Sequence, residues 1–370
     1  MTRLFKINNY WRNIDKHILV SFLLLFILGI FFSFSSTSFL ADERLNKDYY
    51  FFFQKHLVYA LISFFLMILI STINTDLIDR SLLPIFLFFL LLLILVPFFG
   101  VEVKGAKRWL TFYIFRFQPI EFIKPFFILV IAQIIASNRI KSPNLARLIS
   151  FALLSVIILF LLFQPDLGQS VLLIATWISL IFVSGFNVLF LSLILTFVIS
   201  LFFVLLYLAP EKFSYVLTRL MSFMDPEKPG NFQSQKAIEA IKQGGVKGQG
   251  MGEGILKESV PEAHTDYIIA VISEEFGSLV SILIVAIFLF IAFRIIKKVV
   301  NFSENFYKLS LSGLMSLLVF QAFIHVGVNA NLLPTTGMTL PFLSYGGSSL
   351  LSSGIIAGII LNYTSLREKN

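Results

Sequence analysis

The chain has 370 residues, 57% of them hydrophobic and 44 of them phenylalanine, with a mean hydropathy of +0.88. A water-soluble domain cannot bury so much apolar surface, so this composition excludes a soluble protein and indicates one that crosses a membrane several times. The net charge of +8 would suggest nucleic-acid binding in a soluble protein. Here basic cytoplasmic loops explain it better, and we expect no nucleic-acid partner. The absence of cysteine excludes disulfides and thiolate metal sites.

Ten apolar stretches are long enough to cross the hydrocarbon layer, about 30 Å thick, as helices of about 20 residues. They lack the period-2 alternation of barrel strands, so we predict an all-α integral membrane protein that forms a single domain over residues 1–370. The first stretch is too long for a signal-peptide core and is expected to remain as a spanning helix. The predicted spans are residues 18–40, 50–72, 81–99, 119–136, 147–163, 166–184, 188–209, 266–293, 308–331 and 345–364.

The distribution of lysine and arginine predicts the orientation of these spans. Both terminal segments are basic, as are the connections at 137–147 and 294–308, so we place both termini in the cytoplasm. The large segment 210–265, between the seventh and eighth spans, then lies on the extracytoplasmic side. That side carries basic residues that break the usual bias, and such a cluster can bind an anionic headgroup. These residues are Lys104, Lys107, Arg108, Arg116 and seven more Lys or Arg within 210–265.

The segment 210–265 contains a short helical candidate at 233–242 and a glycine-rich run from Gly244 to Gly254. No strand precedes this run and no Gly-Lys-Ser/Thr follows it, so it is neither a dinucleotide-binding nor a phosphate-binding fingerprint. Two interpretations stay open. The run is either a flexible loop or a mobile cover over a substrate groove, in which glycine supplies hinge freedom.

Spans four, six, eight and ten all begin on the outer face, and each begins with polar residues. Helix N-termini carry unpaired N–H groups and a partial positive charge, so they attract anions. Together with Arg108 and Lys124, these helix starts predict a site for a phosphate-bearing ligand. The four starts are Gln118–Lys124, Gln164–Gln169, His264–Asp266 and Ser344–Ser349.

The polar groups of the spans also have structural interpretations. Glu121 and Lys124 are three residues apart and can neutralise one another inside the bundle. Asp166 can cap the helix that follows it. The remaining groups are expected to serve packing: Gln321, His325 and Asn329 as interhelical hydrogen bonders, at least one of Glu274 and Glu275 as a structural carboxylate, and Gly346-Gly347 and Gly354-x-x-x-Gly358 as close helix contacts.

Asp266 is the candidate chemical centre. It lies between a polar segment and a long apolar stretch, next to His264 and Thr265 and close to the glycine-rich run. A carboxylate at the start of a membrane helix is costly to keep unless it is used. These features favour a functional role for Asp266 over a structural one.

Six motifs follow one another along nearly the whole chain: GAKRW (105–109), QPIEFIK (118–124), QPDLGQS (164–170), GQGMGEG (248–254), PEAHTDYIIAVISEEFG (261–277) and LPTTGMTLPFLSYGGSS (333–349). In this order they resemble the SEDS (shape, elongation, division, sporulation) family of bacterial cell-wall proteins. The forms PEAHTDY and TTGMTLPFLSYGGSS are more similar to the division-type branch of that family, and the elongation-type branch is the close alternative.

This resemblance implies a ten-helix fold and a peptidoglycan glycosyltransferase that polymerises lipid II on the outer face of the bacterial plasma (inner) membrane, at the division septum. It implies that Asp266 is catalytic. The family usually has Gln-Pro-Ser-Glu at Gln118–Glu121, so this chain departs from the pattern at Ile120, where a hydroxyl contact is put in doubt. The candidate substrate- or pyrophosphate-binding residues are Arg108, Lys124, Glu121, Asp166, His264 and Ser344.

The expected reaction is an inverting glycosyl transfer, in which Asp266 takes the proton from the acceptor hydroxyl. Arg108 and Lys124 are expected to stabilise the pyrophosphate leaving group. A divalent cation, Mg or Mn, held by Glu121 or Asp166 is a further candidate for this role, and no organic cofactor is expected.

The resemblance also implies a partner, a class B penicillin-binding protein that acts as the transpeptidase, together with other membrane proteins of the division complex. The chain itself shows no Ser-x-x-Lys constellation for cross-linking. Two other functions stay open at this point. The chain could be a lipid II flippase, although few polar residues lie deep in the inner halves of the spans, or a non-catalytic scaffold of the division complex.

Overall fold

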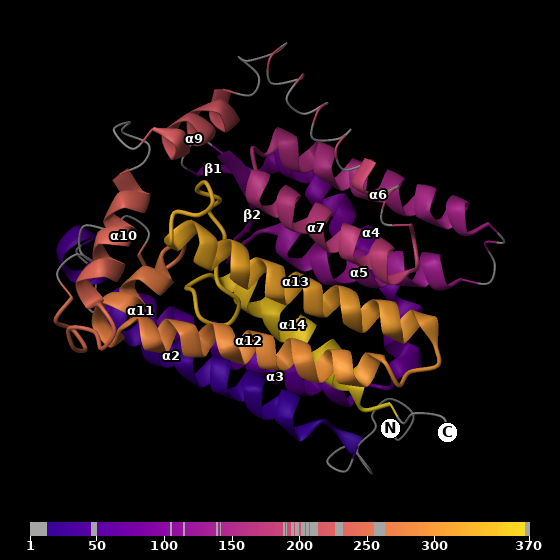
Figure 1. Cartoon of the computed structure of the whole chain (residues 1–370), viewed down its shortest axis with the longest axis horizontal. Helices are drawn as coiled ribbons and strands as arrows, with labels where there is room; N and C mark the ends of the chain where they lie inside the picture. The colour runs from indigo at the N-terminus through magenta and orange to yellow at the C-terminus, as the bar shows by residue number, and fades with distance from the viewer. Residues whose placement is uncertain are drawn as a thin grey trace.

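The computed structural model describes residues 13–45, 50–103, 106–113, 115–137, 140, 142–187, scattered positions from 189 to 207, 214–225, 232–254 and 263–366. Its long helices lie side by side in one bundle (Figure 1), which confirms the predicted helical class. The helices are α2 (Lys16–Leu45), α3 (Phe51–Thr72), α4 (Thr75–Phe99), α5 (Pro119–Ala136), α6 (Pro143–Phe163), α7 (Leu167–Val183), α9 (Ser214–Met224), α10 (Phe232–Gly244), α11 (Ile268–Phe276), α12 (Ser278–Val299), α13 (Asn305–Asn329) and α14 (Gly347–Thr364).

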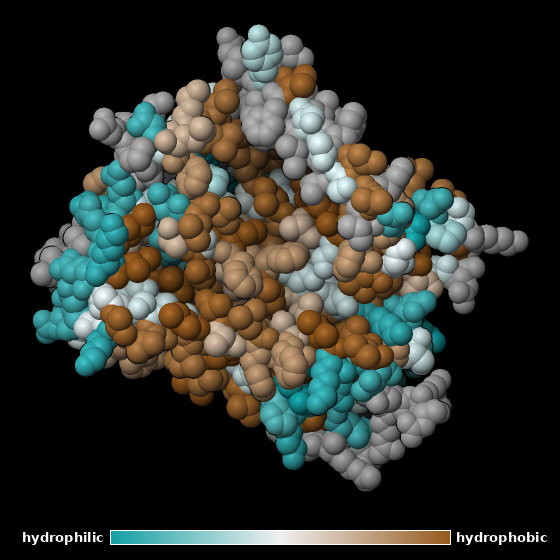
Figure 2. Space-filling model, viewed as in Figure 1, coloured by the Kyte–Doolittle hydropathy of each residue, from teal (hydrophilic) through white to brown (hydrophobic). Residues whose placement is uncertain are grey.

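Seven helices of the described chain are long and apolar enough to cross a membrane: α2, α3, α4, α5, α6, α12 and α13. The apolar α7 is shorter, with 17 residues. The predicted seventh span, 188–209, lies mostly outside the described residues, so the number of ten spans stays a prediction. Figure 2 shows apolar side chains over the middle of one face of the bundle and hydrophilic side chains gathered at its ends, as expected for a protein embedded in lipid.

Helix α14 occupies the interior of the bundle and is buried nearly all round, although it carries several serines and an asparagine. Small residues allow α3 to approach it closely. A Cβ at Gly354 would overlap the Ser63 carbonyl, and one at Gly358 would lie 2.8 Å from the Met67 carbonyl oxygen. The predicted close packing at these glycines is therefore confirmed.

The predicted span 266–293 is wrong as a single helix, because the chain bends at Gly277. Nine residues form α11, and α12 starts anew at Ser278. Gly277 has φ of +86°, a conformation that only glycine adopts easily, and a Cβ there would overlap the Val246 carbonyl. The polar residues Ser273, Glu274, Glu275 and Ser278 flank Gly277 in the sequence, and they were the available sign of this break.

The glycine-rich run is packed against the end of α11 rather than projecting from it. The N–H groups of Gln249 and Gly250 donate to the carbonyls of Glu274 and Glu275, both at 2.9 Å. Glu275 also accepts a hydrogen bond from the N–H of Gly252 at 3.3 Å and one from the hydroxyl of Ser35 in α2. The described part of the run, 244–254, is thus a docked segment, which agrees with neither a flexible loop nor a mobile cover. The helix predicted at 233–242 is confirmed as α10.

A small antiparallel sheet, which the sequence did not predict, joins α4 to α5. It consists of β1 (Val101–Val103), β2 (Ala106–Phe112) and β3 (Phe115–Phe117), in the order β1-β2-β3. Side chains alternate along β2, so Arg108 shares a face with the buried Leu110 whereas Lys107 is exposed. This alternation turns Arg108 toward the bundle.

The two ends of the bundle differ in what they carry. At one end, Asp15 before α2 pairs with Arg294 of α12 at 2.7 Å, and Asp79 accepts hydrogen bonds from Tyr307 at 3.0 Å and Tyr363 at 2.6 Å. The start of α2 and the end of α14 both lie there (Figure 1). The sheet and helices α9, α10 and α11 lie at the opposite end. The candidate site residues belong to this second end.

Candidate functional site

Asp266 lies in a turn, residues 263–267, directly before α11, and its side chain is partly exposed. The backbone of this turn is fixed from two other segments. Three consecutive carbonyls accept hydrogen bonds: His264 O from Tyr345 N at 2.9 Å, Thr265 O from Ser344 Oγ at 2.7 Å, and Asp266 O from Asn329 Nδ2 at 2.9 Å. The turn therefore holds Asp266 in a defined place, which is what a catalytic carboxylate requires.

Asp266 and Arg108 approach each other at Gly337, in the loop between α13 and α14. A Cβ at Gly337 would lie 3.6 Å from Asp266 Oδ2 and 3.8 Å from Arg108 Nη1. The two charged groups, which are far apart in the sequence, thus contact the same point. Gly337 has φ of +71° and no side chain, so the carboxylate and the guanidinium both border the space that a Cβ would occupy at this glycine.

Arg108 is held by the tight connection between α6 and α7. Its Nε donates to the Gln164 carbonyl at 3.0 Å, its Nη2 donates to the Pro165 carbonyl, and Asp166 Oδ2 lies 3.8 Å from Nε. The side chain keeps 15% of its surface exposed. The hairpin thus orients the guanidinium while the Arg108 side chain stays partly exposed.

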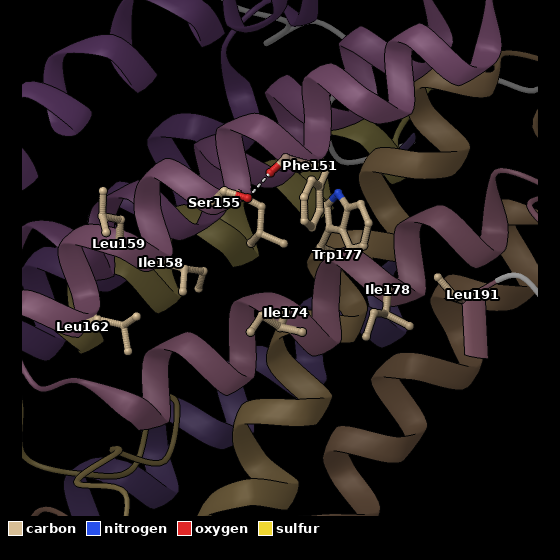
Figure 3. Close-up of a pocket in the computed structure, with 10 residues that line it drawn as sticks. Phe151, Ser155, Ile158, Leu159, Leu162, Ile174, Trp177, Ile178 and Leu191 are labelled. Carbon is tan, nitrogen blue, oxygen red and sulfur yellow. Dashed lines mark hydrogen bonds between the residues drawn. The ribbon is translucent and has the colours of Figure 1, made fainter. Parts of the chain in front are cut away.

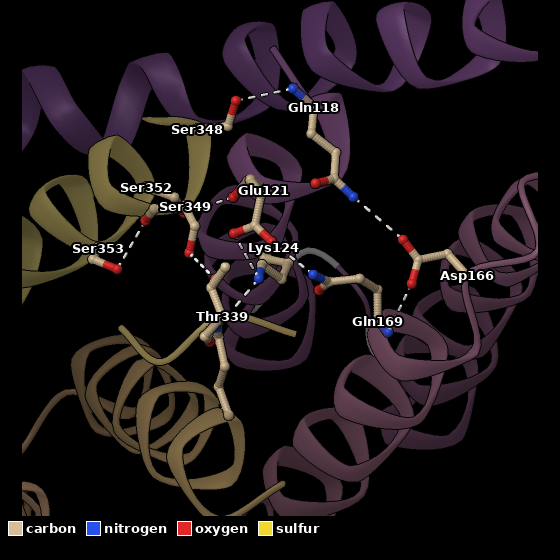
Figure 4. A network of polar contacts seen from close by, with 11 residues as sticks. Gln118, Glu121, Lys124, Asp166, Gln169, Thr339, Ser348, Ser349, Ser352 and Ser353 are labelled. Atoms are coloured by element: carbon tan, nitrogen blue, oxygen red, sulfur yellow. Dashed lines mark hydrogen bonds and ion pairs between the residues drawn. The ribbon is translucent and has the colours of Figure 1, made fainter. Parts of the chain in front are cut away.

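Behind Arg108, a buried polar network joins α5 to α7 (Figure 4). Asp166 caps α7 by accepting from Gln169 N at 3.4 Å, and it also accepts from Gln118 Nε2 at 3.2 Å. Gln169 Nε2 donates to Glu121 Oε1 at 2.6 Å, and Glu121 Oε2 lies 2.9 Å from Lys124 Nζ. The geometry therefore shows both structural interpretations, a cap at Asp166 and an ion pair between Glu121 and Lys124.

Lys124 is fully buried, with 0% of its side chain exposed, and Glu121 retains 5%. An ammonium with no exposed surface cannot touch a ligand in this conformation. The predicted contact of Lys124 with a pyrophosphate is therefore not supported by this geometry. Helices α13 and α14 cover the Lys124 side chain. Gln321 of α13 accepts from Lys124 at 3.2 Å, and Ser352 of α14 donates to the Glu121 carbonyl at 2.6 Å. Among the predicted cations, Arg108 is the one that borders the space at Gly337.

One face of α13 holds the loop that contains Gly337. Gln321 Nε2 donates to the Thr339 carbonyl at 3.0 Å, and His325 Nδ1 lies 2.8 Å from the Met338 carbonyl oxygen. Asn329 holds the Asp266 turn from the same face. The three side chains predicted as interhelical hydrogen bonders are confirmed as hydrogen bonders, and each has at least one partner in the two segments that form the site.

His264 and Ser344 lie at the site, and their side chains contact other residues of the protein. The His264 ring packs against Phe52 and Tyr345, with ring centroids 5.7 and 5.5 Å away. Ser344 is buried, and its hydroxyl accepts from Leu340 N at 2.8 Å while donating to Thr265. Both residues position the turn, and their predicted contact with substrate stays a prediction.

Tyr267, next to Asp266, is not a competing base at neutral pH. Burial raises the pKa of Tyr267 to about 12, and the negative charge of Asp266 adds to this effect. The phenol therefore stays protonated.

The carboxylates do not form a site for a divalent cation by themselves. Within the described residues, no three His, Asp or Glu side chains lie together as metal ligands. Glu121 is neutralised by Lys124, and Asp166 is engaged by Arg108 and Gln118. A cation needs several free oxygen ligands, so these residues do not fit one, and we derive no step through it.

An apolar cavity of about 240 Å³ lies between α6 and α7 (Figure 3). Its lining includes Phe151, Leu162, Ile174 and Trp177. The hydroxyl of Ser155, which also lines it, donates to the Phe151 carbonyl at 2.9 Å and is thus already bonded. Among the described residues that line the cavity, none offers a free group for proton transfer, so we do not expect the reaction there.

Sequence reasoning missed Gly337, Gln169 and Asn329 as parts of the site. Gly337 and Gln169 lie within the quoted motifs, but a glycine that leaves a gap and an amide that joins two carboxylates show their roles only in three dimensions. The four-residue recurrence on α13 was the available signal for Asn329, and it predicted a hydrogen bond without its partner.

Comparison with known proteins agrees with this architecture. The cell cycle protein family FTSW_RODA_SPOVE matches residues 15–369. Two proteins named probable peptidoglycan glycosyltransferase FtsW are similar: that of Caulobacter vibrioides is 33% identical over 356 residues, covering 95% of this chain and 89% of its own, and that of Pasteurella multocida is 34% identical over 362 residues, covering 94% and 89%.

Two solved structures share the fold. A chain from a peptidoglycan synthase complex, whose study concerns the coordination of polymerization and crosslinking, superposes with a TM-score of 0.73 at 23% identity, covering 95% of this chain and 97% of its own. The rod shape determining protein RodA of Thermus thermophilus superposes with a TM-score of 0.69 at 23% identity, covering 97% and 99%. The chain belongs to the FtsW/RodA/SpoVE family of cell cycle proteins, the SEDS family that its motifs predicted.

Proposed function

We propose that this protein is a peptidoglycan glycosyltransferase that polymerises lipid II for septal wall synthesis, with Asp266 as its general base. The similar proteins of Caulobacter vibrioides and Pasteurella multocida, at 33% and 34% identity, are named probable peptidoglycan glycosyltransferase FtsW. The observation that carries the assignment of Asp266 is the meeting of this carboxylate with Arg108 at Gly337. A base and a cation that lie at the same point are the two groups that glycosyl transfer from a pyrophosphate needs.

In the proposed reaction, the Asp266 carboxylate takes the proton from the acceptor sugar hydroxyl. The hydroxyl oxygen attacks the anomeric carbon of the donor, and the bond from that carbon to the pyrophosphate oxygen breaks, so the configuration inverts. The electron pair of the broken bond stays on the pyrophosphate, whose added negative charge faces the Arg108 guanidinium. A pyrophosphate is a good leaving group, so the reaction needs no general acid.

The buried network has a supporting role in this proposal. Asp166, Glu121 and Lys124 fix the ends of α5 and α7, and the hairpin between α6 and α7 in turn orients Arg108. These residues are positioning residues, because their side chains have little or no surface with which to touch lipid II. A divalent cation stays an expectation, and no step of the reaction depends on it.

We further place the protein in the bacterial plasma membrane with both termini in the cytoplasm and the site on the extracytoplasmic face, at the septum. This arrangement is supported by the basic terminal segments and by the separation of the site from the start of α2 and the end of α14 (Figure 1). The partner we propose is a class B penicillin-binding protein within the division complex. The fold it shares with a chain of a peptidoglycan synthase complex supports this partner.

A flippase and a scaffold make different predictions from a polymerase. Liposomes that carry lipid II in one leaflet separate a flippase from a polymerase, since a flippase would translocate lipid II without forming glycan. A scaffold would tolerate any substitution of Asp266 that leaves partner binding intact. We expect glycan product and no translocation.

The assignment of Asp266 is tested by the variant Asp266→Asn, which keeps the size of the side chain and removes the base. We expect polymerisation of lipid II by the purified protein to fall by about 10²–10⁴, the usual contribution of a general base. The matched control is Asp76→Asn, at an exposed position in the first turn of α4. It should polymerise like wild type. Wild-type polymerisation by Asp266→Asn would overturn the assignment.

A further inference from the structure

The short helix α11 begins without a capping side chain of its own within the described residues. Its N-cap position is Tyr267, which makes no side-chain capping bond. The first N–H groups of a helix need acceptors from outside the helix, and a missing cap costs about 0.5–2 kcal/mol. At the third position, Ala270 N is shared between two acceptors, Asn329 Oδ1 and the Tyr267 carbonyl, each at 3.0 Å. The side chain that caps α11 thus comes from α13.

The other end of the same amide holds the residue before the helix. Asn329 Nδ2 donates to the Asp266 carbonyl at 2.9 Å and to the His325 carbonyl at 2.8 Å. Asn329 is 0% exposed. Its oxygen faces a donor and its nitrogen faces two acceptors, so the amide has one satisfactory orientation. Asn329 therefore ties Asp266 and the first turn of α11 to α13 at once.

Asn329 also relates the Asp266 turn to the opposite border of the site. Four and eight residues earlier on the same face of α13, His325 and Gln321 contact the carbonyls of Met338 and Thr339. These two residues directly follow Gly337. One rigid helix thus fixes both the segment that carries Asp266 and the loop at which Asp266 meets Arg108.

We propose that Asn329 is a positioning residue for Asp266, which sets the place of the carboxylate relative to Gly337 and Arg108. The inference rests on the proposed role of Asp266 as the base. Asn329 does not border the space at Gly337 and acts through the backbone of Asp266. Its removal lowers the rate of the chemical step more than the affinity for lipid II, because a misplaced base still leaves the binding groups in position.

The test compares Asn329→Leu with a matched variant at the other end of the bundle, Asn362→Leu. Asn362 is likewise 0% exposed, and its Nδ2 donates to the carbonyls of Ile70, Ser71 and Ile73. Both changes remove a buried amide that clamps a turn, but only one of the turns carries Asp266. Initial rates of lipid II polymerisation are measured against lipid II concentration for the full-length protein, per folded molecule.

We expect Asn329→Leu to lower kcat by about 10- to 100-fold and to change KM by less than about threefold, the size of effect that a misplacement of about 1 Å produces. Asn362→Leu should lower the unfolding temperature and leave kcat per folded molecule unchanged. If Asn329→Leu does not fold, Asn329→Asp replaces it, since it keeps the side-chain shape and the acceptor for Ala270 and loses the donor to Asp266. We expect the same loss of kcat from it.

A double-mutant comparison separates positioning from general structural damage. In the Asp266→Asn background, Asn329→Leu should cause no further loss of residual polymerisation, because the group it positions is already gone. A further loss of the same size as in wild type would overturn the inference, as would wild-type kcat for both Asn329 variants while Asp266→Asn is inactive. Wild-type activity of Asp266→Asn would instead overturn the proposed function and this inference with it.

Discussion

At the scale of single residues, the two predicted cations of the site, Lys124 and Arg108, differ in their burial and in their contacts. Lys124 is fully buried and is bonded by Glu121 and Gln321, whereas the Arg108 side chain stays partly exposed and meets Asp266 at Gly337. The i,i+3 spacing of Glu121 and Lys124 was compatible with a ligand site and with an ion pair, and packing decides between them. A charge that is fully desolvated contributes to holding helices together only while its partner is present.

This difference in burial predicts how the buried pair responds to substitution. Removing one partner, as in Glu121→Gln or Lys124→Met, leaves an uncompensated buried charge, so we expect each to lower the free energy of unfolding by about 3–5 kcal/mol. The double variant should recover a large part of that loss. Thermal unfolding in detergent measures the three variants. A double variant that loses as much as the sum of the single ones would contradict the ion pair.

At the scale of elements, the glycine-rich run is defined by how closely its backbone approaches α11. Gly248 and Gly252 have nearly the same backbone conformation, with φ of +80° and +84°. They differ in their surroundings. A Cβ at Gly248 would overlap the Glu275 carbonyl, whereas nothing lies within 4 Å of one at Gly252. Glycine is therefore required at position 248 for both close packing and backbone conformation, and at position 252 for backbone conformation alone.

Alanine substitutions at these two glycines make a matched pair. Each should cost about 1–2 kcal/mol for the left-handed conformation. Gly248→Ala should cost about 1–3 kcal/mol more, because the added methyl forces the run away from α11. Unfolding midpoints measure the difference. Equal midpoints for the two variants would show that the run does not pack against α11 in solution.

The sequence predicted the elements that depend on long apolar runs and missed those that depend on single residues or on distant partners. Helix α5 was predicted with its observed ends, 119–136, because Pro119 and a polar start mark its first turn. The break at Gly277 was missed because one glycine is compatible with a continuous helix, even though Glu274, Glu275 and Ser278 lie beside it. The sheet was missed because its strands have three to seven residues. Asp266 was identified from its local surroundings, but its relation to Asn329 depends on residues 63 positions apart.

At the scale of the whole molecule, the two ends of the bundle are chemically distinct. One end carries Asp266, Arg108 and the sheet, and the other carries the pair of Asp15 with Arg294. The proposed function requires the first end to lie on the extracytoplasmic side, because lipid II is polymerised on that side. The orientation of the protein is therefore a direct test of the proposal.

The absence of cysteine makes this orientation measurable by labelling single introduced cysteines. Tyr113, at the end of β2, is fully exposed, and Ser303 is exposed between α12 and α13. We expect Tyr113→Cys to react with a membrane-impermeant maleimide in intact spheroplasts and Ser303→Cys to react only after permeabilisation. Tyr113→Cys that stays unlabelled while Ser303→Cys reacts would place the site in the cytoplasm and exclude the proposed reaction.

The bend at Gly277 affects the position of Asp266 relative to the hydrocarbon layer of the membrane. With 22 residues, α12 alone is about 33 Å long, enough to cross the hydrocarbon layer. In the orientation proposed above, the nine residues of α11, up to about 13 Å long, extend from the outer end of α12 and would place Asp266 at the level of the lipid headgroups. The disaccharide and its diphosphate would then keep their hydration while the isoprenoid tail remains in the hydrocarbon layer. In this arrangement no polar group of the growing strand has to enter the bilayer interior.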